Sequence, residues 1–239
     1  MQYIRKFGSG HSAHTVVPRP AAALIDTAQE AALTRWGLSP TFAPATGART
    51  ILDAPTLAHL FALRRDLFDD RAYLSLAADV GSFVESCDLT GLQKGYFEDG
   101  ALIYALRYQY AADLAHNPNY TALWAELYRV AAARDTVLTR FVNASARRGF
   151  AAITALFQFT YAFGLAHGDQ HSFLTCADGH QRFFARFGFQ DISAYHCPHA
   201  GAQRIMRLAL HDGAHLRTVR SPLYDIWTRH TDTPQETDT

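Results

Sequence analysis

The chain has 239 residues, of which 49% are hydrophobic and 18% are charged, and its 22 basic residues balance 22 acidic ones. A chain of this length and apolar content can bury the core of one full domain with extensions. The formal net charge of zero argues against a nucleic-acid-binding protein, because such proteins usually carry a basic excess or stripe. The three cysteines have no regular spacing and predict no disulfide framework.

The first ten residues contain Arg5 and Lys6 with no apolar run behind them, so they do not have the pattern of a signal peptide. We therefore expect a cytoplasmic protein. The most apolar stretch, Phe150–Ala166, is shorter than the about 20 residues that a membrane-spanning helix needs. It is interpreted as a buried core helix, and no integral membrane segment is expected.

Residues 1–47 predict an N-terminal extension. Within it, Ala21–Trp36 has helical periodicity and stops at Gly37, and Ser39–Gly47 has the proline, glycine and small residues of a linker. The central domain is expected over residues 48–215, followed by a C-terminal tail, residues 216–239, that is partly disordered.

The central domain begins with alternating strand and helix patterns. An Asp-Gly pair between two strand-like runs predicts a β-hairpin. The expected elements are a strand at Arg49–Leu52, a helix with Pro55 in its first turn, the hairpin strands Leu92–Phe97 and Ala101–Tyr110, a helix capped by Asn119 and running to about Arg134, and a strand at Thr136–Val142.

The second half of the domain has the order strand, basic glycine loop, long helix, strand, short helix and two strands. Gly168 breaks the chain after the long helix, and Gly188 is placed to end the short helix. The expected segments are the loop Ala144–Gly149, the helix Phe150–Ala166, a strand at His171–Cys176, a helix at Gln181–Phe187, and strands at Phe189–His196 and Arg204–His211.

The loop before the long helix has the features of an anion site. Backbone amides at a helix N-terminus attract phosphate, and Arg147 and Arg148 would add positive charge. Gly149 would allow the backbone to approach the anion closely. The alternative is an ordinary strand-to-helix turn with two solvated arginines.

This order of elements resembles the GNAT acyltransferases. Phe183–Phe189 is similar to their "FYxxLGF" element beside the acyl-carrier thiol, and Ala146–Ala151 is similar to their "Q/R-x-x-G-x-G/A" pyrophosphate loop. The resemblance implies an α/β (α+β) fold with a mixed, splayed central sheet flanked by helices. It also implies a thioester site formed by Arg147, Arg148, Gly149, Phe150, Ala151 and Phe184.

The upstream half resembles one branch of that superfamily, the acyl-homoserine lactone and N-acyl amino acid synthases. These share an "LRxxxF" helix, an acidic pair, an arginine in a central strand and an "ExxRF" strand, and the resemblance covers about Thr50 to Asp212. The matching residues are Arg64 and Phe68 on the helix, Glu85 and Asp88 as the acidic pair, Arg107 in the strand, and Arg140 in the segment Leu138–Phe141.

The resemblance implies roles for these residues. Arg107 and Arg140 lie in apolar strand-like runs, where an unpaired charge would be costly, so Glu85 and Asp88 are their expected partners. The network would orient an amine substrate, with Arg64 and Phe68 beside it. The alternative is structural: solvated helix-surface arginines, capping carboxylates and surface ion pairs.

Two positions depart from the family pattern. Val137 stands where the "ExxRF" glutamate is expected, and Phe184 replaces the common tyrosine acid. Transfer to an amine needs a group that accepts a proton. That group would be Glu85, Asp88, a histidine or a water, and His180 is the best-placed histidine, although it is equally explained as a residue that starts a helix.

The segment His196–His199 (HCPH) invites a metal interpretation. Zinc would need further ligands at defined spacing, and only His211 and His215 lie near in sequence. A turn between two strands explains the segment more simply, and no metal site is expected.

The sequence thus predicts an N-acyltransferase with no permanent cofactor, using acyl-ACP or acyl-CoA as co-substrate and a small-molecule amine, such as an amino acid, as acceptor. A carrier protein is then a potential partner. A hydrophobic tunnel for a medium or long acyl chain is expected from the resemblance. Two alternatives stay open: a catalytically degenerate domain that binds a thioester or carrier protein, and an ordinary acetyl-CoA-dependent enzyme.

Overall fold

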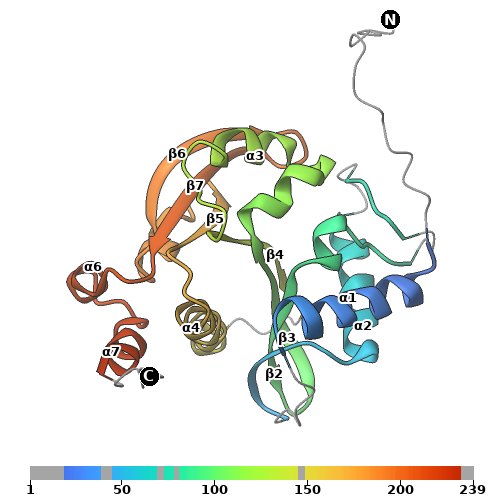
Figure 1. Ribbon diagram of the computed structural model, residues 1–239, viewed down its shortest axis with the longest axis horizontal. Coiled ribbons are helices and arrows are strands. Elements are labelled where there is room, and N and C mark those ends of the chain that lie inside the picture. Colours follow the sequence, from blue (N-terminus) through green and yellow to red (C-terminus); the bar gives the residue numbers. More distant parts are fainter. Residues whose placement is uncertain (1–18, 39–44, 69–72, 78–80, 145–148, 233–239) are drawn as a thin grey trace, which may run out of the picture.

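The computed structural model describes residues 19–38, 45–68, 73–77, 81–144 and 149–232. A seven-stranded mixed sheet, in the order β1-β2-β3-β4-β5-β7-β6, has helices on both faces (Figure 1). The helices are α1 (Ala21–Arg35), α2 (Ala54–Phe68), α3 (Thr121–Leu127), α4 (Phe150–Ala166), α5 (Gln181–Ala185), α6 (Gly213–Thr218) and α7 (Tyr224–Asp232). The strands are β1 (Gly47–Thr50), β2 (Leu92–Glu98), β3 (Ala101–Tyr110), β4 (Thr136–Asn143), β5 (His171–Ala177), β6 (Gln190–Cys197) and β7 (Gly201–Ala209).

The predicted hairpin is confirmed as β2 and β3. Asp99 and Gly100 have φ values of 49° and 79°. Two consecutive residues with positive φ are the requirement of the tight turn that suits the right-handed twist of paired strands. The sequence pair Asp-Gly therefore sets the register of the hairpin, which positions Arg107 in β3 opposite Gln93 in β2.

The expected splay of the sheet is also confirmed, between β4 and β5. These strands run parallel and pair only over three residues, from Thr136 opposite Ser172 to Leu138 opposite Leu174. Beyond Leu138 each strand continues, β4 to Asn143 and β5 to Ala177, without pairing to the other. The sheet is therefore open on one side of this point.

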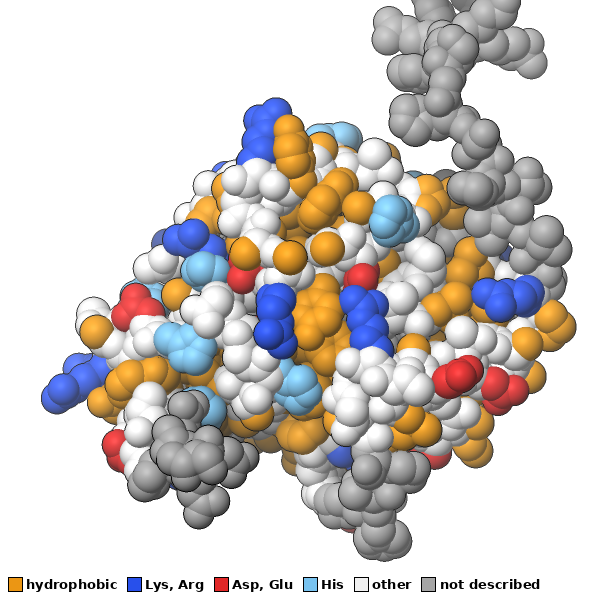
Figure 2. Space-filling view, viewed as in Figure 1, with side chains coloured by type: hydrophobic (Ala, Val, Ile, Leu, Met, Phe, Trp, Pro, Cys, Tyr) orange, Lys and Arg blue, Asp and Glu red, His pale blue; other side chains and the backbone are white. Residues whose placement is uncertain are grey.

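The two faces of the sheet are covered by different helices. Side chains alternate along β3, so Tyr104, Leu106 and Tyr108 pack with α4 residues, whereas Ala105 packs with α2 residues. In Figure 1, α4 lies on one side of β2, β3 and β4, and α1 and α2 lie on the other. Figure 2 shows basic and acidic side chains scattered over the same view, with no single basic stripe on that face.

Helix α4 has the bounds that its pattern predicts, and one face of it is buried in the main core. No helix in the described ranges is both long and apolar enough to cross a membrane. The short helix α5 is confirmed, and the chain reverses after it at Gly188, whose φ is 100°.

One expectation needs correction. The helix predicted from Asn119 to about Arg134 begins instead in a 3₁₀ turn, whose cap is Asn117, and α3 ends at Leu127. The tail contains the end of α6 and the whole of α7, and the segment expected to be disordered lies mostly outside the described residues. Leu216 and Leu223 of this tail are fully buried in the main core, so it packs against the sheet and α4. Helix α1 packs similarly on α2 and buries Leu24.

Candidate functional site

A cavity of about 920 Å³ occupies the opening between β4 and β5. It is lined from both faces of the sheet, because the strands that would separate those faces diverge here. We call the part on the α4 face the α4-side lobe; its lining includes Tyr104, Leu106, Leu138, Ile153, Phe157 and Leu174. We call the other part the α3-side lobe; its lining includes Tyr73, Asn119, Tyr120, Leu123, Tyr195 and Cys197.

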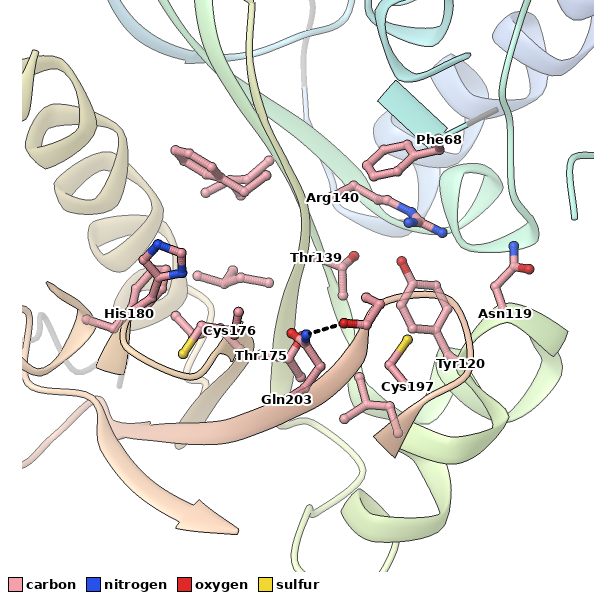
Figure 3. Close-up of a pocket in the computed structure, with 18 of the residues that line it drawn as sticks. Phe68, Asn119, Tyr120, Thr139, Arg140, Thr175, Cys176, His180, Cys197 and Gln203 are labelled. Carbon is pink, nitrogen blue, oxygen red and sulfur yellow. Dashed lines mark hydrogen bonds between the residues drawn. The ribbon is translucent and has the colours of Figure 1, made fainter. Parts of the chain in front are cut away.

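Figure 3 shows how the polar groups divide over the cavity. Arg140, Asn119 and Tyr120 lie on one side of the cavity. His180 and Cys176 lie on the opposite side, and Thr139 lies between the two groups. The side chains named for the α4-side lobe are apolar apart from the Tyr104 hydroxyl, whereas the α3-side lobe carries a guanidinium, an amide and phenolic hydroxyls.

A buried ionic network lies behind the α3-side lobe. Its five charged members, three arginines and two carboxylates, are at most 9% exposed. Glu85 is bound by two arginines and an amide, and Asp88 is bound by two arginines. The contacts are Arg140 Nε and Nη2 to Glu85 (2.6 Å each), Arg107 Nη1 to Glu85 and to Asp88 (2.9 Å each), Asn119 Nδ2 to Glu85 (2.6 Å), and Arg64 Nη1 to Asp88 (2.7 Å).

Local sequence explains why the two carboxylates lie together. Glu85 precedes the 3₁₀ turn η2 (Ser86–Leu89), and its amide donates to Asp88 Oδ2 at 2.8 Å. The Glu85 side chain accepts in return from a backbone amide of the turn, which completes a reciprocal capping box. The capping interpretation of these carboxylates is therefore confirmed, together with their predicted pairing to Arg107 and Arg140.

Arg140 is held in an unusual backbone conformation. Its φ is 52°, and the pairing of β3 with β4 shifts at this point. Thr139 lies opposite Arg107 and Val142 lies opposite Ala105, so three steps along β4 correspond to two steps along β3. Strand β4 thus has one extra residue, a β-bulge. The guanidinium lies over aromatic rings, 4.1 Å from the Tyr73 ring centroid and 4.5 Å from that of Phe68.

The network holds its carboxylates ionised. Burial alone would raise the pKa of Glu85, but Arg107 and Arg140 lower it well below the usual range for a carboxyl. Burial likewise opposes ionisation of Asp88, and Arg107 and Arg64 lower its pKa. Three guanidinium groups against two carboxylates leave one positive charge, and Arg140 is the charged member that lines the cavity.

The structure separates the predicted site residues into two groups. Phe68, Arg140, His180 and Phe184 line the cavity. Among the described residues around the cavity, the lining does not include Arg64, Glu85, Asp88 or Arg107. Arg64 was expected beside the substrate, but it is fully buried against Asp88. The position of both carboxylates is at odds with direct contact to an acceptor amine.

The predicted phosphate loop is described only in part. Arg147 and Arg148 lie outside the described residues. The Gly149 amide donates to the Tyr104 hydroxyl at 3.1 Å, and Phe150 and Ala151 are exposed in the first turn of α4. The Arg186 guanidinium lies 4.4 Å from the Phe150 ring centroid, which places an additional cation near this helix end.

Two contributors to the network were missed from the sequence. Asn119 was interpreted as a helix cap, but its side chain bridges Glu85 and the Leu74 carbonyl. Tyr120, which follows it, accepts a hydrogen bond from Arg107 at 2.8 Å. In the segment His196–His199, His196 and Cys197 end β6, and Pro198 and His199 lie in the turn that leads to β7. The described residues contain no group of three or more potential metal ligands.

Neither a protein-family model nor a curated protein matches the sequence. Solved structures do match the fold. The N-acyl amino acid synthase FeeM from uncultured soil microbes aligns at a TM-score of 0.54 and 13% identity over 74% of this chain and 99% of that one. A CoA-dependent acyl-homoserine lactone synthase, BjaI, aligns at a TM-score of 0.55 and 15% identity, over 78% of this chain and 99% of BjaI. The acyl-homoserine lactone synthase LasI aligns at a TM-score of 0.52 and 16% identity, over 69% of this chain and 87% of LasI. The chain therefore has the GNAT-like fold of these acyl-transferring synthases.

Proposed function

We propose that the protein is an N-acyltransferase that moves a medium or long acyl chain from a thioester to the amine of a small carboxylate-bearing molecule, such as an amino acid. The observation that carries this proposal is the cavity that passes through the sheet where β4 and β5 diverge. An apolar lobe on one face and a polar lobe on the other suit the two halves of an acylated amino compound.

The thioester would enter beside the N-terminus of α4. Its phosphates would bind at the loop that includes Arg147, Arg148 and Gly149, with Phe150 and Ala151 at the helix start, since helix N-termini favour anions. Phe184 lines the cavity on this side, where the thiol would lie. Such a site accepts the phosphopantetheine arm of either acyl-CoA or acyl-ACP, the two donors that the proposal includes.

The acyl chain would occupy the α4-side lobe. Leu106, Leu138, Phe157 and Leu174 are each at most 8% exposed and present only hydrocarbon to the cavity. Each methylene buried in such a lobe contributes about 0.8 kcal/mol. An acetyl group would leave most of this surface without contact, which disfavours the acetyl-CoA alternative.

The acceptor would occupy the α3-side lobe. Because the network behind it keeps one uncompensated positive charge, the lobe attracts an anion, and Arg140 is the group that faces it. No Asp or Glu is among the described lining residues, so nothing there would bind a second cationic group. An acceptor with a carboxylate fits better than a polyamine.

In the reaction, the acceptor nitrogen attacks the thioester carbonyl, the amide bond forms, and the C–S bond breaks to release the thiol. The attacking ammonium must first lose a proton. Histidine is the side chain that most often acts as a general base in enzymes, and His180 lines the cavity on the thiol side. We assign proton removal to His180, directly or through water. Glu85 and Asp88 then act by positioning Arg107 and Arg140 rather than by accepting the proton.

The runner-up is a binding module without turnover. Val137 and Phe184 stand at positions where the resembled families have proton-transferring side chains. Val137 is fully buried on the α3 face, so it has no access to the cavity.

The test is a direct assay of acyl transfer. The purified chain is incubated with acyl-CoA donors from acetyl to palmitoyl, or with the matching acyl-ACPs, and a mixture of amino acids and polyamines. Mass spectrometry should detect N-acyl amino acids, made fastest from medium or long donors. Binding of thioester with no acylated product would support the binding module, and preference for acetyl would support the ordinary acetyltransferase.

A further inference from the structure

The α4-side lobe ends where β4 and β5 come together. Leu138 and Leu174 are the last paired residues before the strands diverge, and both line the cavity. Phe157, from the middle of α4, closes the same end from the helix side. These three side chains are 3–8% exposed, so they form a closed floor beneath the lobe.

A second, smaller void lies beyond this floor. Its volume is about 20 Å³, and its lining includes Tyr108, Thr160, Ser172 and Leu208. Leu138 and Phe157 line both the large cavity and this void. They are therefore the partition between the two spaces, and removal of either side chain would join them.

Of the two partition residues, Phe157 is the one whose side chain can change with little effect on the sheet. Leu138 belongs to the short stretch of β4 that pairs with β5. Phe157 lies in a regular helix, and its ring stacks on Phe187 at 4.7 Å between centroids. The Phe157 benzyl group is therefore the part of the partition that a substitution can remove without changing the strand pairing.

The far side of the partition is mostly apolar, and its lining includes Phe189, Leu208, Leu210 and Leu223. The Thr160 and Tyr108 hydroxyls already donate to the Leu156 carbonyl and to Asp169, and the Ser172 hydroxyl has no hydrogen-bond partner among the described residues. Phe157 and Leu138 close this small space off from the acyl lobe. An acyl chain in the native protein would stop at Phe157.

We propose that Phe157 sets the upper limit of acyl length by separating the acyl lobe from the void beneath it. This inference rests on the proposed function, because it assigns the α4-side lobe to the acyl chain. A smaller side chain at this position should let the chain extend by about two methylenes into the space of the benzyl group and the void. Since each buried methylene changes binding about fourfold, the longest accepted donor should gain roughly fifteenfold.

The test compares Phe157→Leu and Phe157→Ala with wild type across donors from butyryl- to palmitoyl-CoA. Binding is measured by calorimetry and turnover by release of free CoA. Phe159→Leu is the matched control, because Phe159 lies on the same helix but contacts Lys94 and the α7 side, away from the cavity. Phe157→Leu retains a branched apolar side chain, so it keeps the test valid even if Phe157→Ala does not fold.

We expect both Phe157 variants to shift the preferred donor to longer chains in binding and in turnover, and the control to keep the wild-type preference. If the Phe157 variants keep the wild-type order of donors, Phe157 does not set the length. That result leaves the proposed function intact as long as the wild type binds and transfers long chains. If no acyl donor of any length binds the wild type, the proposed function fails as well.

Discussion

Glu85 accepts two hydrogen bonds of 2.6 Å from Arg140, although 55 residues separate them in the chain. This contact joins the cap of a 3₁₀ turn to the β-bulge of β4. It ties the one charged group of the network that lines the cavity to a carboxylate that no solvent reaches.

Removing this carboxylate should destabilise the fold. Glu85→Gln leaves Arg140 and Arg107 without their shared anion inside the core, and the loss of one partner of a buried pair typically costs about 3–5 kcal/mol. Urea denaturation would measure the change in the free energy of unfolding. Glu126→Gln, at an exposed position of α3, is the control and should stay within about 0.5 kcal/mol of wild type. A Glu85 variant as stable as that control would show that the network is dispensable.

The thioester loop can be tested at Gly149. Among the described residues, a Cβ built on Gly149 meets only the Ala152 Cβ, at 4.0 Å, and the φ of −118° suits any residue. Gly149→Val should therefore fold normally while blocking close approach of phosphate. The Michaelis constant for the thioester should rise at least about tenfold, the scale of one hydrogen bond to a charged group. Gly81→Val is the control, because no described atom lies within 4 Å of a Cβ at that position, and it should leave the Michaelis constant unchanged. If the two variants have the same Michaelis constant, the loop does not belong to the thioester site.

The assignment of proton removal to His180 predicts a loss of rate without a loss of binding. His180→Gln should keep thioester affinity and lower the maximal rate about 100-fold, the usual scale for loss of a general base. His116→Gln, at an exposed position before α3, is the control and should keep the wild-type rate. An unchanged maximal rate in His180→Gln would place the base elsewhere or assign proton removal to solvent.

Buried Lys94 predicts a stabilising substitution. Its Nζ has no hydrogen-bond partner among the described residues and lies 3.3 Å from the Phe163 ring centroid. Burial lowers the pKa of this amine well below its ordinary value, and Asp169 only partly opposes that shift. Lys94→Met keeps the length of the side chain and removes the unsatisfied polar group, so the free energy of unfolding should rise by about 1–3 kcal/mol. A less stable variant would show that the amine is charged and held by the surrounding aromatic rings.

Asp169 predicts a pH dependence of stability. Burial raises the pKa of its carboxyl to about 7, with Lys94 opposing the shift, against an ordinary value of 3.8. The folded state thus holds the proton more tightly than the unfolded state. This contribution to stability is complete below pH 3.8 and is lost as the pH rises through about 7. Asp169→Asn keeps an acceptor for the Tyr108 hydroxyl, which donates to Asp169, and should flatten this part of the unfolding profile. If the free energy of unfolding varies with pH in the same way in wild type and in Asp169→Asn, the raised pKa of Asp169 is contradicted.

Local patterns in the sequence were sufficient for most of the fold. The apolar run Phe150–Ala166 predicted the bounds of α4, and Asp99-Gly100 predicted the hairpin, because both depend on short-range geometry. The pairing of Glu85 with Arg140 was inferred from the cost of burying an unpaired charge. The burial of Arg64 and the bridging role of Asn119 were not predicted. Asn119 contacts Glu85 across 34 residues, and such a contact exists only once the sheet and α2 have packed together.

The bulge in β4 decides on which face of the sheet the positive charge lies. In a regular strand, side chains two residues apart share a face, so Arg140 would follow Leu138 toward α4. With one residue added, Thr139 and Arg140 both point to the Glu85 side, and Phe141 returns to stack on Tyr104. The separation of polar and apolar lobes is therefore a property of residue count as well as of residue type. Deleting Phe141 would restore the regular alternation, turn the Arg140 guanidinium into the hydrocarbon lobe and leave Glu85 without its bidentate partner.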